Sequence, residues 1–214
     1  MTEQTILDAR INYVYYRTKI SAYISAPFDE GKEILRREEY EIISLEENAM
    51  FRIREGTSAG ISRNGNWVKE GVLYVPNKGI FLTKKSPIMK NAKEATACHR
   101  KEIEYYLNDE QIEESLSDCV RLLGNPIPTY SFADNPITAY AFGEQAEAYG
   151  NFLKQAGITE MPTWLSDMQD KPFARQIAFG CLCHRGCGTG IIGDYSGLHD
   201  SQIRVRGIFN YEYE

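Results

Sequence analysis

The hydrophobic periodicity of this chain changes twice, and these changes restrict its fold more than any other feature. Apolar residues alternate with period two in residues 10–85, recur at helical spacing in residues 91–169, and return to period two in residues 172–212. Strands followed by helices and then strands indicate an α+β protein, because βαβ units would alternate the two periods throughout. The sequence therefore predicts an antiparallel β meander, a central helical segment, and a C-terminal β hairpin or strands that join the sheet.

The length and the lack of a linker favour one domain. The chain has 214 residues and no Ser/Gly-rich or long polar stretch, and domains of this size are common. We predict a single α+β domain over residues 1–214. The sequence gives no indication of the oligomeric state.

Turn-forming residues divide the first part of the chain into strands. Strands are predicted at residues 13–16, 40–45 and 49–53. Asn64-Gly65 lies between apolar residues and favours a tight hairpin, because Asn and Gly tolerate positive φ angles. The run Pro76-Asn77-Lys78-Gly79 predicts a second hairpin, in which proline presets one turn dihedral.

Capping residues mark the helices of the middle segment. We predict helices over residues 92–107, 108–123 and 135–157, with a short helical turn around residues 162–168. Asn108 with Gln111 three residues later is typical of a capping box. Asn135 followed by Pro136 indicates a helix start, and Gly157 a helix end. His99 is expected to be an exposed helical residue.

Composition limits the environment and the partners. The net charge is −6, which disfavours non-specific binding of nucleic acid. The sequence has neither a secretory signal nor a run of about 18 apolar residues, so we expect no membrane partner. Five cysteines are an odd number and too few for a disulfide scaffold. We therefore expect reduced thiols and a cytoplasmic location.

One short segment is an exception to the acidic character of the chain. Residues 84–101 contain six basic residues and one acidic residue, whereas residues 102–118 contain seven acidic residues and no lysine or arginine. The opposite charges fit two helices that attract each other or two separate partner surfaces, and solvated faces are the plainer interpretation. Nucleic-acid binding is expected only through residues 84–101, if at all.

The main cluster of side chains that could bind metal or react lies near the C-terminus, where three cysteines fall within seven residues. Cys181 and Cys183 point to the same face if they lie on a strand, and the glycine-rich turn that follows can bring Cys187 back toward them. A histidine, His184 or His199, would complete a tetrahedral zinc site. We predict a zinc knuckle formed by Cys181, Cys183, Cys187 and His184. The competing interpretation is a buried strand packed with small thiols.

The same residues support an enzymatic alternative. Cys187 has candidate bases in His184 and His199, and Asp194 or Asp200 would orient the base. This set would suit a thiol-dependent transferase or hydrolase. A zinc hydrolase with an open coordination position is the other enzymatic reading.

Nucleotide chemistry is disfavoured. Residues 188–193 match the GxGxxG string, but only 21 residues follow and they do not form the helix and second strand that dinucleotide binding requires. No phosphate-binding GxxxxGK[ST] loop occurs, so we expect no nucleotide cofactor. The leading hypothesis is a soluble intracellular binding protein with a protein partner, and zinc is the one cofactor expected.

Overall fold

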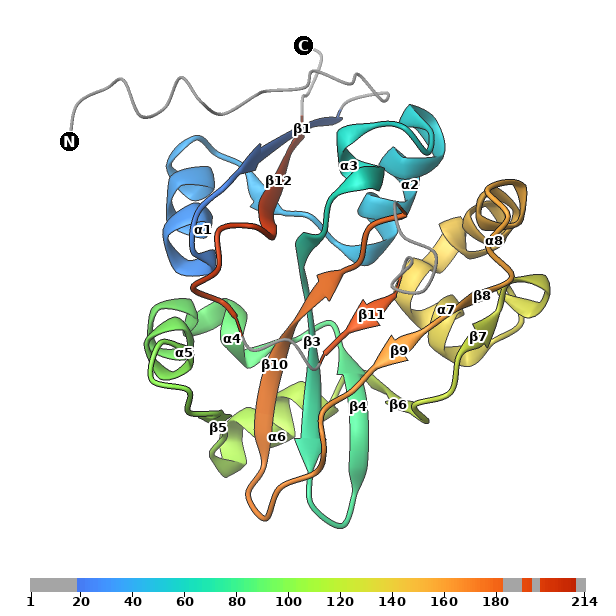
Figure 1. The fold of residues 1–214 in the computed structure, drawn as a ribbon. Coiled ribbons are helices and arrows are strands. Elements are labelled where there is room, and N and C mark those ends of the chain that lie inside the picture. Colours follow the sequence, from blue (N-terminus) through green and yellow to red (C-terminus); the bar gives the residue numbers. More distant parts are fainter. Residues whose placement is uncertain (1–18, 183–189, 194–196, 211–214) are drawn as a thin grey trace.

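The computed structural model describes residues 19–182, 190–193 and 197–210 (Figure 1). The α-helices are α1 (Phe28–Arg37), α2 (Leu45–Glu55), α3 (Gly60–Arg63), α4 (Pro87–Lys90), α5 (Ala92–His99), α6 (Asp109–Leu116), α7 (Pro136–Phe142) and α8 (Ala146–Gln155). The strands are β1 (Lys19–Ile24), β2 (Glu41–Ile42), β3 (Asn66–Val75), β4 (Gly79–Thr83), β5 (Tyr105–Tyr106), β6 (Cys119–Leu122), β7 (Ile127–Pro128), β8 (Glu160–Met161), β9 (Thr163–Trp164), β10 (Phe173–Phe179), β11 (Ile191–Ile192) and β12 (Arg204–Asn210). Two short 3-10 helices, η2 (Thr129–Ser131) and η3 (Gly143–Gln145), flank α7.

Within these residues, ten strands form one mixed sheet. Its main path runs β1-β12-β3-β10-β11-β9, while β2 pairs with β12, β4 with β3, β6 with β4, and β5 with β10. The pairs β12–β3 and β11–β9 are parallel, and the other pairs in the sheet are antiparallel. The predicted α+β class is confirmed. The predicted N-terminal meander is wrong, because β3 lies between strands from the end of the chain.

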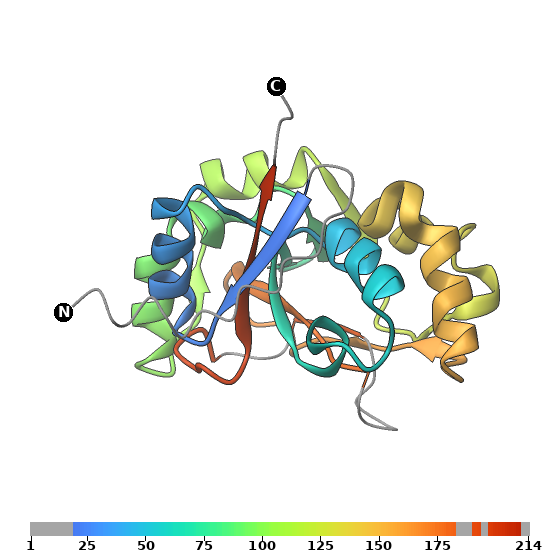
Figure 2. The ribbon, with the colours of Figure 1, turned by 90° about the horizontal axis from the view of Figure 1, so that it is seen from above.

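The alternation of β3 supplies two hydrophobic cores. Val68, Val72 and Tyr74 face the core that contains α2, α7 and α8. Trp67 and Leu73 point the other way, into the core that contains α1, α4, α5 and α6. Figure 2 shows these two groups of helices on opposite sides of the strands.

Helix α2 replaces the strand predicted at residues 49–53. Ser44 accepts a hydrogen bond from the backbone N–H of Glu47, and the Glu47 carboxylate accepts one from the Ser44 N–H, which completes a capping box. The buried Glu70 carboxylate on β3 accepts a further bond from the Leu45 N–H at 3.0 Å. The helix start thus has both local and tertiary partners. The strand predicted at residues 40–45 is reduced to β2.

The two predicted hairpins have different outcomes. The Asn64-Gly65 hairpin is wrong, because α3 precedes this dipeptide and β3 follows it. The second hairpin is confirmed as β3–β4, with Val75 paired to Gly79. Asn77 and Gly79 have φ angles of 62° and 125° and make the turn. The strand predicted at residues 13–16 lies outside the described residues.

The predicted helices of the middle segment are shorter than their patterns. Helix α5 ends at His99, after which Glu102 adopts a φ of 57° and Tyr105 pairs with β10. Helix α6 has the predicted Asn108 capping box but ends at Leu116. The apolar residues that follow form β6 on the edge of β4. Cross-strand pairing therefore overrides the helical spacing of residues 119–123.

The third predicted helix is present in two parts. Asn135 caps α7 and Pro136 occupies its first turn, as predicted. Gly143, with a φ of 49°, separates α7 from α8, and α8 ends before Gly157. The helical turn predicted at residues 162–168 is wrong, since β9 begins there and pairs with β11.

The C-terminal strands join the sheet, as predicted. Strand β12 pairs antiparallel with β1 and parallel with β3, and β10 pairs antiparallel with β3. None of the helices in the described ranges has the length and apolar character needed to cross a bilayer.

Candidate binding surface and cysteine segment

The cysteine segment, residues 181–189, begins close after the end of strand β10. Strand β10 ends at Phe179, and the Gly180 N–H donates to the Gly190 carbonyl at 3.1 Å, just before β11. This bond and the β10–β11 pairing bring Gly180 and Gly190, which flank the segment, together. Cys181 is half-buried and forms no disulfide with another described cysteine.

The other predicted members of the site lie outside the described residues, namely Cys183, His184, Cys187 and Asp194. His199 is described and lies exposed in a turn, followed by the half-buried Asp200. Among the residues that the structure describes, no group of three or more His, Cys, Asp or Glu side chains could hold a metal ion. The zinc knuckle and the thiol site both stay predictions.

A buried arginine holds the start of the cysteine segment. The Arg52 guanidinium donates to the Gly180 carbonyl at 2.7 Å and to the Tyr149 hydroxyl at 3.2 Å. It also lies 4.1 Å from the centre of the Phe179 ring. Charge-assisted bonds of this kind are stronger than bonds between neutral groups. Arg52 therefore fixes the backbone from which Cys181 extends.

A second anchor holds β9 and the residues after β11. The Tyr74 hydroxyl donates to the Gly193 carbonyl at 2.9 Å and accepts from the Ser166 N–H at 3.0 Å. The Gly193 N–H donates to the Trp164 carbonyl at 2.8 Å. Glycine is required at 193, since a Cβ there would lie 2.7 Å from a methyl group of Val72. The backbone at Trp164 and at Ser166 is thus held by buried groups.

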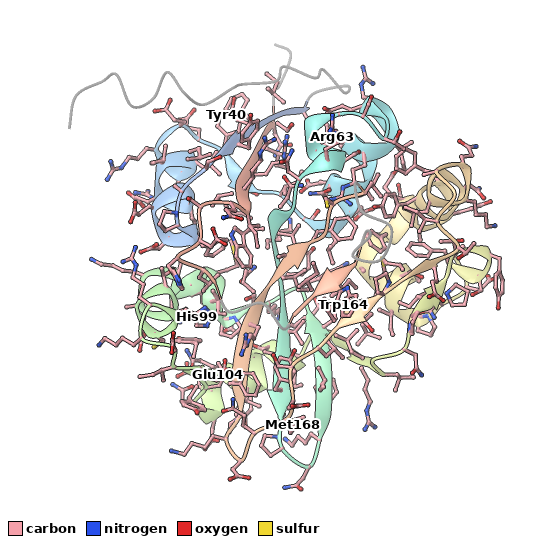
Figure 3. The ribbon with its side chains drawn as sticks, in the orientation of Figure 1. Tyr40, Arg63, His99, Glu104, Trp164 and Met168 are labelled. Carbon is pink, nitrogen blue, oxygen red and sulfur yellow. The ribbon has the colours of Figure 1, made fainter. Side chains whose placement is uncertain are left out.

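Polar side chains from three separate segments converge beside β10. Arg175 on β10 forms an ion pair with Glu104, and Glu104 also accepts a bond from Gln169 at 3.4 Å. Thr96 and His99 on α5 are buried nearby, with His99 only 3% exposed. We call Thr96, His99, Glu104 and Arg175 the Arg175 cluster. Figure 3 shows His99 and Glu104 one above the other along β10.

The Arg175 cluster contains polar atoms that no described residue satisfies. Both ring nitrogens of His99, the Thr96 hydroxyl and one Glu104 carboxylate oxygen are buried without a hydrogen-bond partner in the described part of the chain. Burial, with the charges of Arg175 and His199, lowers the pKa of His99 to about 4. His99 is therefore neutral at pH 7, with one donor and one acceptor nitrogen. The expectation of an exposed His99 is wrong.

Large apolar side chains are exposed on β5, on β9 and in the segment between β9 and β10. Trp164, Met168 and Tyr106 are 41%, 40% and 44% exposed, which is high for large apolar side chains. The Tyr106 hydroxyl donates to Gln169 at 3.1 Å, which ties β5 to the segment between β9 and β10. We call Trp164, Met168, Gln169 and Tyr106 the aromatic strip. Figure 3 shows Trp164 beside β11 and Met168 farther down.

Three of the six basic residues in segment 84–101 have a polar side-chain partner among the described residues. Lys90 forms an ion pair with Glu114 of α6, Arg100 forms one with Glu30, and the Lys85 ammonium lies 3.0 Å from the Ser117 hydroxyl. Of the interpretations left open for the basic and acidic segments, attraction between them is supported by one ion pair, Lys90–Glu114. Nucleic-acid binding through residues 84–101 stays a prediction, and these contacts lower the charge on which it depends.

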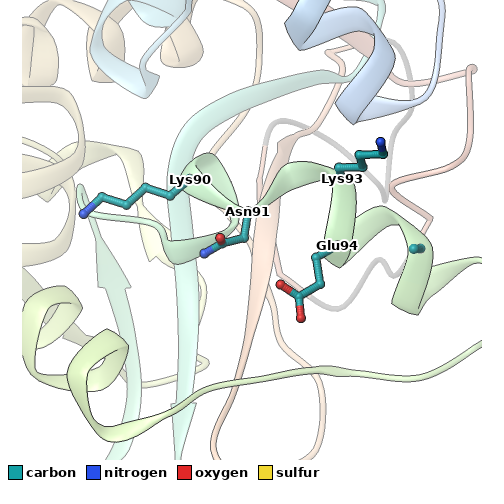
Figure 4. Close-up of a pocket in the computed structure, with 5 residues that line it drawn as sticks. Lys90, Asn91, Lys93 and Glu94 are labelled. Carbon is teal, nitrogen blue, oxygen red and sulfur yellow. The ribbon is translucent and has the colours of Figure 1, made fainter.

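A groove of about 440 Å³ lies on the same helices. Lys90, Asn91, Lys93 and Glu94 line it, and Figure 4 shows Lys90 and Lys93 pointing away from each other. Since Lys90 is bound to Glu114 and the remaining charges have opposite signs, the groove does not focus charge on one ligand.

Sequence reasoning missed the Arg175 cluster and the aromatic strip. The signal available for the cluster was Arg175-Gln176 inside the otherwise apolar strand Phe173–Phe179, because charged residues are rarely buried without a partner. The sequence predicts a helical turn at Trp164, whereas the structure places Trp164 on the edge strand β9.

Comparison with known proteins gives a fold and no family. No known protein family matches the sequence, and no curated protein matches it. A solved structure described as "Accommodation of massive sequence variation in Nanoarchaeota by the C-type lectin fold" is similar, with a TM-score of 0.64 and 15% identity over 94% of this chain and 100% of that chain. At that identity the likeness concerns the fold alone. The chain thus has a fold similar to the C-type lectin fold.

Proposed function

We propose that this protein is a binding protein that holds a protein partner on the aromatic strip, beside the Arg175 cluster. The observation that carries this proposal is Trp164, a large side chain exposed on an edge strand whose backbone is fixed. Rigid presentation lowers the entropy lost when a partner binds. The similar fold in the Nanoarchaeota structure is described as one that accommodates massive sequence variation, which suits a scaffold with an adaptable surface.

The composition of the strip favours a protein partner. Tryptophan, tyrosine and methionine are enriched at protein interfaces, and tryptophan and tyrosine often carry most of the binding energy. Gln169, which belongs to the strip, is exposed and adds a side-chain amide. Polar groups of this kind give direction to an otherwise apolar contact.

The test compares Trp164→Ala with Tyr130→Ala as a matched control. Tyr130 is 78% exposed and lies in η2, outside the strip. Immobilised wild-type protein and both variants are incubated in parallel with a lysate of the source cells, and retained proteins are quantified by mass spectrometry. We expect a partner that the wild type and Tyr130→Ala retain and that Trp164→Ala loses. Identical retention by all three proteins would contradict the proposal.

A second candidate function rests on the closure of the cysteine segment. We propose that Cys181, Cys183, Cys187 and His184 bind one zinc ion, supported by the Gly180–Gly190 bond that brings together the two residues flanking this segment. Short hairpins that carry cysteines are typical of structural zinc sites. Such a knuckle would stiffen the segment beside β11 and is compatible with the binding role.

Metal content tests the knuckle. Protein purified without chelator or affinity nickel should contain about one zinc per chain, and the Cys181→Ser/Cys183→Ser/Cys187→Ser variant should contain none. Cys119→Ser, which changes a cysteine of β6, is the control and should keep the metal. If the wild type contains no zinc, the remaining explanations of the cysteine cluster are packing of buried thiols and a reactive thiol. Fast labelling selective for Cys187 would then favour the thiol enzyme, with His184 or His199 as its base.

A further inference from the structure

A small cavity separate from the aromatic strip lies between α1, β2, β3 and α4. Its volume is about 230 Å³. Lys32 and Arg36 of α1 line one side, and Lys69 of β3 and Met89 of α4 contribute to the others. Figure 1 shows α1 beside α4 and α5. We call this cavity the α1–α4 pocket.

The basic residues of the pocket come from two different elements. Lys32 and Arg36 are four residues apart on α1 and therefore lie on the same helix face, while Lys69 comes from the strand. The ammonium groups of Lys32 and Lys69 form no ion pair or hydrogen bond with another residue in the part of the chain that the structure describes. Two ammonium groups are thus available to an anion.

The acidic groups around the pocket do not cancel this charge. Glu33 binds Arg36 at 2.9 Å but also binds Arg37, so one carboxylate serves two guanidinium groups. Among the described residues that line the pocket, Glu41 is the one acidic residue, against the three basic residues Lys32, Arg36 and Lys69.

Two further carboxyls interact electrostatically with Lys69. Glu47 does so, but it forms an ion pair with Lys19 at 2.7 Å. Glu70 is fully buried, and its burial raises its pKa to about 7, which leaves it partly protonated at neutral pH. The pocket therefore keeps an excess of positive charge.

Size and lining narrow the ligand class. The volume is below the roughly 300–1,000 Å³ of pockets for drug-sized molecules, so the ligand is compact. Met89 and Ile42 give apolar wall, and Tyr40 adds an aromatic ring fixed at 5.7 Å from the Phe209 ring. A phosphate monoester carries close to two negative charges at pH 7 and three acceptor oxygens. We infer that the α1–α4 pocket binds a small organic phosphate monoester, with the phosphate on Lys32, Arg36 and Lys69 and the organic group on the apolar wall.

The inference is tested by nuclear magnetic resonance titration of the full chain with phenyl phosphate and with inorganic phosphate. Backbone amide shifts should change around Tyr40, Lys69 and Met89, and phenyl phosphate should bind more tightly than inorganic phosphate. Equal affinity of the two probes would overturn the assignment of an organic phosphate. Shift changes scattered over the other lysines would overturn the site itself.

Three variants distinguish binding in the pocket from nonspecific binding to positively charged side chains. Lys32→Met and Lys69→Met, which lie on different elements, should each weaken phenyl phosphate binding about tenfold or more, because charge-assisted bonds to phosphate are lost. Lys93→Met removes an exposed lysine of the other groove and should leave the affinity unchanged. Unchanged affinity in both pocket variants, measured on protein with a wild-type melting temperature, would refute the inference, as would equal weakening by Lys93→Met.

Discussion

The buried carboxyl of Glu70 makes the stability of the fold depend on pH. Burial raises the pKa of Glu70 from 4.5 to about 7, although its hydrogen bond from the Leu45 N–H opposes the rise. Because the folded state holds this proton more tightly than the unfolded state, the contribution of Glu70 to stability is fully present below pH 4.5. It is lost as the pH rises from 4.5 to about 7.

The size of this effect follows from the two pKa values. A difference of roughly 2.5 pH units, at about 1.4 kcal/mol per unit, corresponds to a loss of about 3 kcal/mol between pH 4 and pH 8. Glu70→Gln keeps an oxygen that can accept the Leu45 bond but carries no titrating group. We expect the variant to match the wild type within about 1 kcal/mol at pH 4 and to be more stable than the wild type by about 3 kcal/mol at pH 8.

Urea denaturation followed by tryptophan fluorescence and circular dichroism measures the free energy of unfolding across this range. Glu41→Gln is the control, since it changes an exposed carboxyl on the neighbouring strand β2, and its pH profile should run parallel to that of the wild type. Parallel profiles for the wild type and Glu70→Gln from pH 4 to pH 8 would refute the reasoning. They would mean that Glu70 ionises in the folded protein as readily as in water.

Three other substitutions test the anchors of the fold by chemical denaturation. Arg52→Met removes the bond to the Gly180 carbonyl and leaves that oxygen buried, so we expect the free energy of unfolding to fall by about 2–4 kcal/mol. A fall of less than about 1 kcal/mol would contradict the role of Arg52 in holding this backbone. Tyr74→Phe removes only the hydroxyl that binds Gly193, and its expected cost is about 1–2 kcal/mol without a change in the circular dichroism spectrum. Ser44→Ala should cost about 1 kcal/mol through the lost capping box, and the same cost should not appear in Ser44→Asp, which can still cap α2.

Local chemistry in the sequence predicted those elements whose start and end depend on neighbouring residues. The Asn108 capping box, the Asn135-Pro136 start and the turn before Gly79 are all present. Ser44 and Glu47 form the same kind of capping pair at the start of α2, beside residues with β propensity. The strand predicted at residues 49–53 is wrong because the capping pair outweighs the β propensity of these residues.

Other elements depend on partners that are distant in the sequence. Residues 119–122 have apolar spacing compatible with a helix, and they form a strand because β4 offers an unpaired edge. The Arg175 cluster joins residues that are more than seventy positions apart, Glu104 and Arg175 among them. Periodicity within a window of a dozen residues carries no information about such pairings. The cysteine segment, in contrast, was visible in the sequence, and its chemistry stays a prediction.

The position of β12 between β1 and β3 has a consequence for how the chain folds during synthesis. Ile20 pairs with Phe209 and Asn66 with Arg204, so the middle of the sheet is completed by the last strand that the structure describes. Until that strand leaves the ribosome, β1 and one edge of β3 have no partner and expose backbone groups to other chains. Sheets closed by such distant pairings fold slowly and are prone to aggregate while incomplete. We therefore expect the nascent protein to be exposed to aggregation for longer than a protein of the same length built from local hairpins.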